Sequence, residues 1–264
     1  MTDADFAELT LEALGSSTPR VWSFLVTMFG DLALAPEARL SGTTVNAVTA
    51  AIGIKPEATR VALHRLRKEG WIESHRKGRQ TRYGLTSHGR SETQAAWSRV
   101  YGPSDSDQDV YLVLENPSAS VEPTRFPQSA AIVQIGTRSF VTTAAPHSDQ
   151  QLRVSLRSDD PLPDWIAEKL CPSELQSASQ DLLRRLEDVL NRSDFRALSL
   201  LQHLALRVVV VHEWRRLILR SAAFPEYIMP HGWKGPDCRA AFTTLLGHLP
   251  VPNLSTLDQD LEAG

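Results

Sequence analysis

The stretch of sequence that decides the fold is residues 55–86, KPEATRVALHRLRKEG followed by WIESHRKGRQTRYGLT. Pro56 stands where a helix would begin, a position at which its missing N–H costs nothing. Gly70 is a typical helix stop, and the apolar residues between the two recur at helical spacing. We therefore predict an amphipathic helix. The β-branched and aromatic residues on either side of the turn at 77–79 then predict a β-hairpin.

Further helices are predicted on both sides of this stretch. Apolar residues over 21–29 form a helical stripe, which we expect to end at Gly30-Asp31. A second helix follows, capped by Thr43 or Thr44, and another begins after the hairpin, capped by Ser87. The order helix, strand-like loop, helix, tight turn, helix, basic hairpin predicts an N-terminal winged helix-turn-helix.

Basic charge is concentrated in this region. Residues 55–90 contain ten Lys and Arg residues and three Glu residues, although the whole chain has a net charge of −3. Clustered cations are what a surface needs to neutralise DNA phosphates and displace their counterions. The predicted DNA contacts are Lys55, Thr59, Arg60, His64, Arg67, Lys68, Lys77, Arg79 and Arg82. The alternative is a solvated basic face on a module used only for protein contact.

The helix and the hairpin are expected to make different DNA contacts. The third helix of such folds lies in the major groove, and the side chains expected to reach base edges are Thr59, Arg60, His64 and Arg67. Those expected to hold phosphates or enter the minor groove are Lys77, Arg79 and Arg82. We expect Trp71 and Tyr83 to pack the hairpin against the helices.

The rest of the chain predicts a mixed fold. After a polar break at 102–107, strands are expected over 110–114, 130–135, 140–143 and 152–156, and helices over 164–170 and 173–191. A long helix from Asp194 to about Arg220 and a last one from Pro236 to about His248 follow, with a frayed tail from Pro250. The fold class is α+β, with domains at 1–100, 101–175 and 176–264; the last is helical.

Several classes of protein are excluded. The longest apolar stretch, 204–211, is too short to span a membrane, and the acidic N-terminus does not resemble a secretory signal, so we expect a cytoplasmic protein. Cys171 and Cys238 lie far apart without metal-binding spacing, so no metal is expected and both are expected to be reduced. No catalytic motif is present, and we expect neither enzymatic activity nor a cofactor.

Two groups of motifs resemble a known family. Residues 24–31 (FLVTMFGD), 62–71 (ALHRLRKEGW) and 79–86 (RQTRYGLT) resemble the N-terminal domain of the PaaX family of phenylacetate-catabolism repressors. Residues 211–220 (VHEWRRLILR) and the prolines, glycines and tryptophan within 224–235 resemble that family's C-terminal domain. The resemblance implies a Cas2-like, ferredoxin-type middle domain that helps form a homodimer. It also implies a repressor of an aromatic-acid operon, released from double-stranded operator DNA by an acyl-CoA effector such as phenylacetyl-CoA.

The C-terminal motifs contain the candidate effector-binding residues. His212, Arg215 and Arg216 share a helix face and could hold the phosphates or thioester carbonyl of a CoA ester. The alternative is an internal ion-pair network, with Glu213 as the acceptor and Trp214 in the core.

Trp233 also allows two interpretations, because it could stack on an aromatic effector or anchor its loop. The alternative function is a ligand-independent regulator or activator whose C-terminal region, 176–264, serves only assembly.

Overall fold

The computed structural model describes residues 1–15, 20–78, 80–103, 108–118, 126–127, 130–144, 148–157, 162–192 and 194–263. Within these ranges the chain forms ten α-helices and two small sheets, which is the predicted α+β class. The chain divides into two compact units, which we describe separately. The first unit contains residues 1–98, 182–216 and 237–264, and the second unit contains 99–181 and 217–236. The predicted division into three domains stays a prediction.

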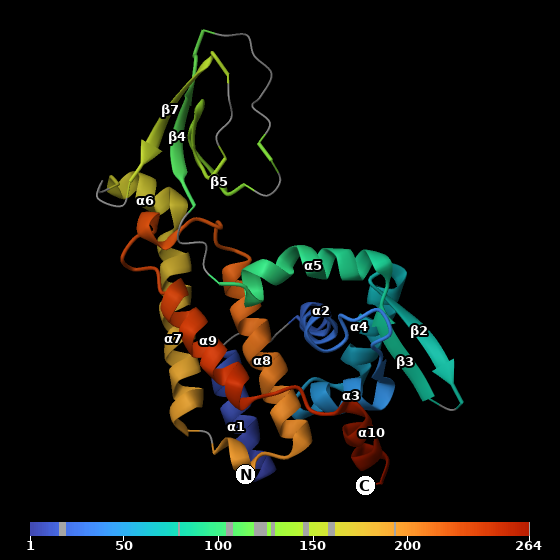
Figure 1. The fold of residues 1–264 in the computed structure, drawn as a ribbon. Coiled ribbons are helices and arrows are strands. Elements are labelled where there is room, and N and C mark those ends of the chain that lie inside the picture. The colour runs from blue at the N-terminus through green and yellow to red at the C-terminus, as the bar shows by residue number, and fades with distance from the viewer. Residues whose placement is uncertain are drawn as a thin grey trace. The chain divides into compact units, whose positions relative to one another are not determined.

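The N-terminal part of the first unit follows the predicted order of elements. Its helices are α1 (Asp3–Leu14), α2 (Val21–Leu32), α3 (Gly42–Ala51), α4 (Pro56–Lys68) and the start of α5 (Ser87–Tyr101). A three-stranded antiparallel sheet has the order β1 (Leu40–Ser41), β3 (Gln80–Leu85), β2 (Ile72–Lys77). Figure 1 shows β2 and β3 extending together beyond the helices of this unit.

The C-terminal part of the chain supplies the other helices. These are α7 (Ser173–Arg192), α8 (Leu200–Ile218), α9 (Gly235–His248) and α10 (Leu254–Ala263), with short 3-10 turns at Phe195–Ala197 and Glu226–Ile228. The apolar stretch 204–211 lies in α8 and is buried apart from Arg207, as predicted for a core helix. None of the helices in the described ranges is both long and apolar enough to cross a membrane.

The second unit is built on a four-stranded antiparallel sheet. The strand order is β5 (Ile132–Gly136), β6 (Ser139–Thr142), β4 (Val110–Glu115), β7 (Gln151–Leu156), and α6 (Asp164–Leu170) packs against β5. Val110, Val141 and Leu170 are buried in its core. Ferredoxin-like sheets connect their strands through two crossover helices. The described residues between β4 and β5, and between β6 and β7, contain no helix, so the ferredoxin-like assignment stays a prediction.

Three helix ends differ from the sequence predictions. Gly30 and Asp31 lie inside α2 rather than ending it, because Gly30 faces Thr93 at close range and Asp31 pairs with Arg207. The cap of α3 is Ser41, whose hydroxyl accepts from the Thr44 N–H at 2.9 Å. The hydroxyl that caps α5 belongs to Thr86, which accepts from the Gly89 N–H at 3.0 Å.

The two ends of the chain and the start of α8 also differ. Asp194 caps only the short turn that precedes α8, and the Ser199 hydroxyl accepts from the Gln202 N–H at the start of that helix. Helix α1, which was not predicted from the sequence, begins with a capping box between Thr2 and Asp5. The tail expected to be frayed forms α10, which packs against α3 because Leu257 is buried.

Candidate nucleic-acid interface

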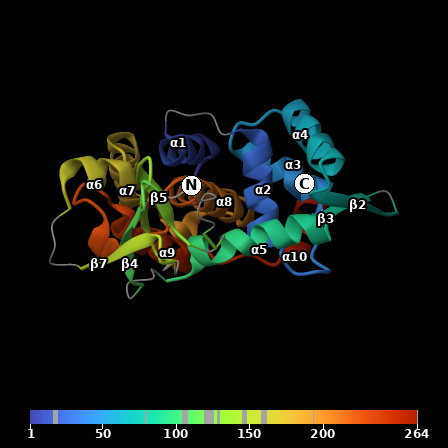
Figure 2. The same ribbon diagram turned by 90° about the horizontal axis from the view of Figure 1, so that it is seen from above.

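The local sequence of α4 places its polar side chains on one face. Pro56 occupies the first turn, and Gly70, with φ of +73°, follows the last turn. The buried residues of α4 are Thr59, Ala62, Leu63 and Leu66, and the helix packs against α2, α3 and β2. Because these residues recur at helical spacing, the opposite face of α4 is left to the solvent. Figure 2 shows α4 beside α2 and α3 at the margin of the first unit.

The exposed face of α4 carries four of the predicted DNA contacts, and a fifth precedes the helix. Lys55, Arg60, His64, Arg67 and Lys68 are all exposed. The last four form an array of cations and hydrogen-bond donors on one helix face, suitable for contact with phosphates and base edges, and Lys55 is the N-cap residue of α4. We call these five residues the α4 basic face.

Thr59 does not fit the prediction that it contacts DNA. Its side chain is fully buried, and its hydroxyl donates to the Thr49 hydroxyl oxygen at 3.0 Å, joining α4 to α3. A threonine at this position faces the core because it shares the helix face of Leu63 and Leu66. We therefore correct the prediction and remove Thr59 from the contact set.

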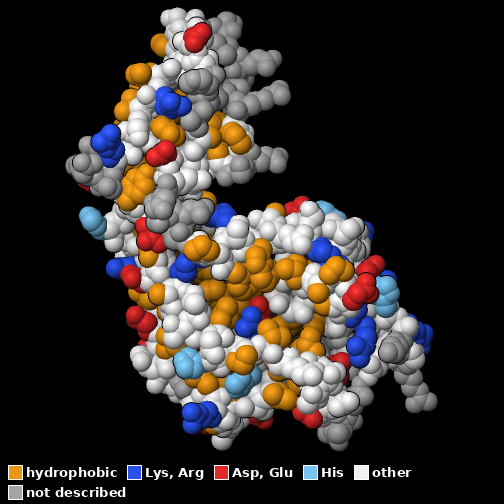
Figure 3. Space-filling model, in the orientation of Figure 1, with side chains coloured by type: hydrophobic (Ala, Val, Ile, Leu, Met, Phe, Trp, Pro, Cys, Tyr) orange, Lys and Arg blue, Asp and Glu red, His pale blue; other side chains and the backbone are white. Residues whose placement is uncertain are grey.

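The hairpin presents the second group of predicted contacts. Lys77 pairs with Gln80 at the tip of the ladder, and Gly78 supplies the positive φ, +63°, of the turn. Arg79 lies outside the described residues, as does the side chain of Lys77. Arg76, which was not in the predicted set, is exposed on β2. Figure 3 shows Lys and Arg side chains on the surface at this end of the first unit.

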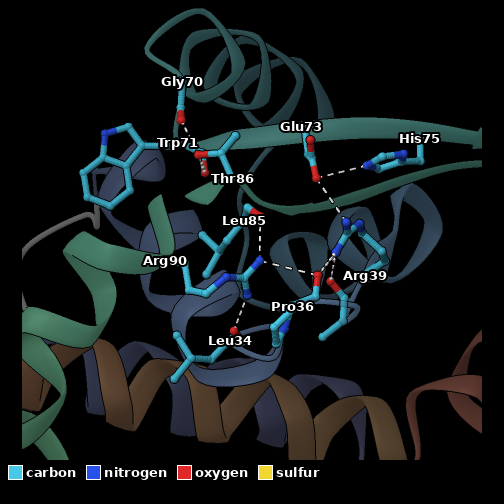
Figure 4. A network of polar contacts seen from close by, with 11 residues as sticks. Leu34, Pro36, Arg39, Gly70, Trp71, Glu73, His75, Leu85, Thr86 and Arg90 are labelled. Atoms are coloured by element: carbon cyan, nitrogen blue, oxygen red, sulfur yellow. Dashed lines mark hydrogen bonds and ion pairs between the residues drawn. The ribbon is translucent and has the colours of Figure 1, made fainter. Parts of the chain in front are cut away.

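A polar network fixes the base of the hairpin to the helices (Figure 4). Arg39 donates to the Pro36 and Ala38 carbonyls at 2.7 and 2.9 Å and pairs with Glu73 of β2 at 3.0 Å. Arg90 of α5 donates to the carbonyls of Leu34 and Leu85. Two of the arginines near the hairpin thus hold its orientation rather than facing solvent.

The aromatic packing at this base agrees with the sequence prediction for Trp71. Its ring meets Trp22 of α2 edge to face at 5.7 Å and lies 5.7 Å from the ring of His88 in α5. Arg65 of α4 lies over Trp22 and pairs with Glu69 at 2.7 Å. The guanidinium of Arg65 therefore contacts Trp22 and Glu69 within the protein, although it belongs to the basic residues of α4.

The last predicted hairpin contact, Arg82, is held by the C-terminal helix. Its guanidinium lies 3.3 Å from a carboxylate oxygen of Asp258 in α10, and its side chain is 35% exposed. The other oxygen of Asp258 accepts from the Ser41 and Thr44 hydroxyls at 2.6 and 2.5 Å. One buried carboxylate therefore joins α10 to α3, β1 and β3.

The predicted effector segment in α8 forms an ion-pair network. Glu213 is buried and pairs with Arg185 of α7 at 3.1 Å and with Arg216 at 2.9 Å. Trp214 is fully buried. This is the arrangement that the alternative interpretation predicted. Arg215 and Arg216 both remain partly exposed.

His212 is placed where it cannot hold a phosphate as a cation. Its ring is fully buried, and Nδ1 lies 3.1 Å from the hydroxyl oxygen of Thr27, while Nε2 has no hydrogen-bond partner among the described residues. Burial, together with the charges of Arg216 and Arg215, lowers the pKa of His212 from its ordinary value to about 3. The neutral ring is a core residue, so we correct its prediction as an effector contact.

Trp233 lies in the second unit and packs within its own loop. Its indole lies directly over the α-carbon of Gly235, where any Cβ would approach ring atoms at 2.3 Å. The backbone N–H of Trp233 donates to the Pro230 carbonyl at 2.9 Å. Gly235 is required at this position because a side chain would displace the indole. The arrangement fits the loop-anchor interpretation, and the side chain is partly exposed.

One buried ion pair, between α2 and α8, was not predicted from the sequence. Asp31 and Arg207 form two bonds of 2.7 and 2.8 Å, and Arg207 also donates to the Leu249 carbonyl at 2.8 Å. Their side chains are 1% and 11% exposed. The sequence contains one sign of this pair: Arg207 stands within the apolar stretch 204–211. A charged side chain that is buried with such a stretch needs a partner of opposite charge.

The described residues contain neither a metal-binding cluster nor a reactive thiol. No group of three or more His, Cys, Asp or Glu side chains among them could hold a metal ion. Cys171 and Cys238 are free and buried, and burial raises their pKa values to about 11 and about 12. Neither thiol is suited to act as a nucleophile at neutral pH.

Comparison with known proteins agrees with the two regions singled out above. The profile described as "PaaX-like protein" matches residues 20–89, and that described as "PaaX-like protein C-terminal domain" matches residues 172–254, together more than half of the chain. The transcriptional repressor PaaX of Escherichia coli (strain K12) is 23% identical over 243 residues, 82% of this chain and 76% of that protein. An uncharacterized protein from Mycobacterium tuberculosis has a solved structure with a TM-score of 0.47 and 17% identity, over 90% of this chain and 95% of that one.

Proposed function

Because the chain belongs to the PaaX-like protein family, whose members are transcriptional regulators rather than enzymes, we propose that it is a repressor that binds operator DNA through a winged helix-turn-helix. In this proposal α4 lies in the major groove, and β2 and β3 form the wing. The α4 basic face is the observation that supports it, since α4 buries its two leucines and exposes Arg60, His64 and Arg67 together.

The proposed active form is a homodimer in the cytoplasm. Two protomers related by a two-fold axis would place two copies of α4 in successive major grooves, about 34 Å apart, on a near-palindromic operator. The middle segment, 101–175, is proposed to be the Cas2-like domain that helps the dimer form. The antiparallel order β5-β6-β4-β7 supports this assignment, because ferredoxin-like sheets have the same strand order.

Charge reversal on α4 tests the DNA-binding part of the proposal. Fluorescence anisotropy would measure binding to duplexes recovered from a random library by the wild-type protein. We expect Arg60→Glu to raise Kd about tenfold or more and to reduce its dependence on salt. Arg184→Glu is the matched control, because Arg184 lies on α7 and its side chain is 65% exposed. Equal binding by both variants, or no duplex retained at low ionic strength, would contradict the proposal.

The proposed signal is an acyl-CoA of an aromatic acid, such as phenylacetyl-CoA, which would relieve repression of a phenylacetate-type operon. The partly exposed Arg215 and Arg216 are the proposed phosphate contacts, while the buried His212 is not. Linkage requires that an effector which weakens DNA binding also binds more weakly to the DNA complex. We expect phenylacetyl-CoA, but not CoA alone, to release bound duplex. Unchanged affinity across a series of acyl-CoA esters would remove this class of effector.

A regulator without a small ligand is the second candidate, with the C-terminal region serving only assembly. The network around Glu213 favours it, because Arg185 and Arg216 already satisfy that buried carboxylate. Thermal unfolding distinguishes the two candidates. A ligand at one hundred times its Kd stabilises the folded state by about 2.7 kcal/mol, whereas the second candidate predicts no shift in Tm with any acyl-CoA ester.

A further inference from the structure

The exposed face of α4 carries one large apolar side chain, although polar residues are usual on a helix face in contact with water. Val61 is 67% exposed, the largest fraction among the large hydrophobic residues of the described ranges. A β-branched residue is also a weaker helix former than the straight-chain polar residues usual at such positions. Neither packing within the protein nor helix propensity therefore accounts for valine at this position.

The neighbours of Val61 indicate what covers it. One turn of helix separates Val61 from Glu57 and from His64 and Arg65, and Lys68 lies two turns on, so these residues share its face. Arg60 and Lys68 are exposed beside it. Glu57 lies on this face and Arg65 pairs with Glu69, but Arg60 and Lys68 add positive charge on either side of Val61. An exposed apolar side chain between cations is suited to a polyanion that also presents an apolar group.

The flank of Val61 is also apolar. Val61 lines an open groove of about 630 Å³ between α4 and the start of α2, and Trp22, Ala58 and Ala62 contribute to its wall. Arg20, Arg65 and Glu57 lie at the same groove, so its charged side chains are two cations and one anion. The exposed methyl groups of Val61 thus lie at the margin of an apolar surface that carries positive charge.

We propose that Val61 determines part of the DNA sequence preference by packing against the 5-methyl group of a thymine in the major groove. This inference rests on the proposed function, in which α4 is the recognition helix. The thymine methyl is the apolar group that base edges present in the major groove, and small apolar side chains are its usual partners. The charges around Val61 then bind the phosphates or polar edges on either side of that thymine.

Replacing thymine by deoxyuridine removes this methyl group and leaves base pairing intact. The probes are duplexes recovered from a random library by the wild-type protein, with each thymine replaced in turn. Burial of one methyl group changes Kd by about fourfold. We therefore expect one replacement per half-site to weaken wild-type binding about fourfold, while Val61→Ala binds the thymine and deoxyuridine duplexes equally.

Two further variants keep the test interpretable. Val61→Ile retains a branched apolar side chain and should still prefer thymine, and Leu11→Ala removes a comparably exposed side chain of α1, 63% exposed, and should change nothing. Helical circular dichroism checks that Val61→Ala is folded. The inference is overturned if no thymine methyl affects binding, or if Val61→Ala keeps the full preference for thymine. A changed oligomeric state with unchanged DNA preference would likewise overturn it and identify the patch as a protein interface.

Failure of the proposed function gives a different result. In that case the wild-type protein retains no duplex at low ionic strength, or Arg60→Glu binds as tightly as the wild type. The inference about Val61 alone fails when the wild type binds DNA, depends on Arg60, and ignores the thymine methyl.

Discussion

Asp258→Ala should destabilise the first unit through the contacts of α10 with α3, β1 and β3. The carboxylate accepts hydrogen bonds from the Ser41 and Thr44 hydroxyls at 2.6 and 2.5 Å and lies 3.3 Å from Arg82. The residue is 8% exposed, so water cannot fully replace these contacts once the carboxylate is removed.

The magnitude follows from the three contacts. A hydrogen bond to a charged group contributes about 1.5–3 kcal/mol net. Only one of the two hydroxyls loses its acceptor outright, because the Ser41 hydroxyl can still donate to the Thr44 hydroxyl oxygen, 3.2 Å away. The partly exposed Arg82 pair adds at most about 1 kcal/mol because solvent screens it. We expect the free energy of unfolding to fall by about 2–4 kcal/mol.

Urea denaturation followed by tryptophan fluorescence measures this change, because Trp22 and Trp71 lie in the first unit. Asp260→Ala is the matched control: Asp260 is on the same helix and is exposed, so its loss should change stability by about 0.5 kcal/mol or less. If both variants have the urea midpoint of the wild type, α10 does not stabilise α3, β1 and β3, and the reasoning is refuted.

Two further predictions concern stability. Since the folded-state pKa of His212 is about 3, the unfolded chain takes up its proton first, and this residue's contribution to stability falls as the pH drops below about 6.5. Between about pH 7.5 and pH 5.5 it accounts for a loss of about 1.4 kcal/mol, which His212→Gln should remove; an identical pH dependence in both proteins would refute this. Gly89→Ala should lower stability by about 1–3 kcal/mol, since its Cβ would lie 2.2 Å from the Trp71 carbonyl oxygen. Gly247→Ala, with nothing within 4 Å, should be neutral or stabilising in thermal unfolding, and equal Tm values for the two variants would contradict the steric argument.

Local patterns in the sequence were sufficient for most elements of the interface. Pro56 and Gly70 mark α4 to within a residue or two. The β2–β3 ladder ends at the Lys77–Gln80 pair, so the hairpin lies where it was predicted, although Lys77 belongs to β2 rather than to the turn. The strands of the second unit also lie close to their predicted ranges. These predictions succeed because capping, turn formation and amphipathic spacing depend on residues a few positions apart.

The site itself was predicted less completely. Thr59 was predicted to reach a base edge because it lies in an early turn of the predicted recognition helix. The structure buries it because the Thr49 hydroxyl of α3 accepts its hydrogen bond. Similarly, the basic patch was counted as a whole, although Arg90 and Arg65 are used in contacts within the protein.

The sequence by itself determined the family, the order of the N-terminal elements and the concentration of positive charge on α4 and the hairpin. Only the tertiary structure decided which polar residues remain available to a partner. Asp258 with Ser41, and Asp31 with Arg207, are paired across 217 and 176 positions of the chain. No local spacing encodes such pairs, because they form only when packing of the apolar faces brings distant helices together and removes water from the groups between them.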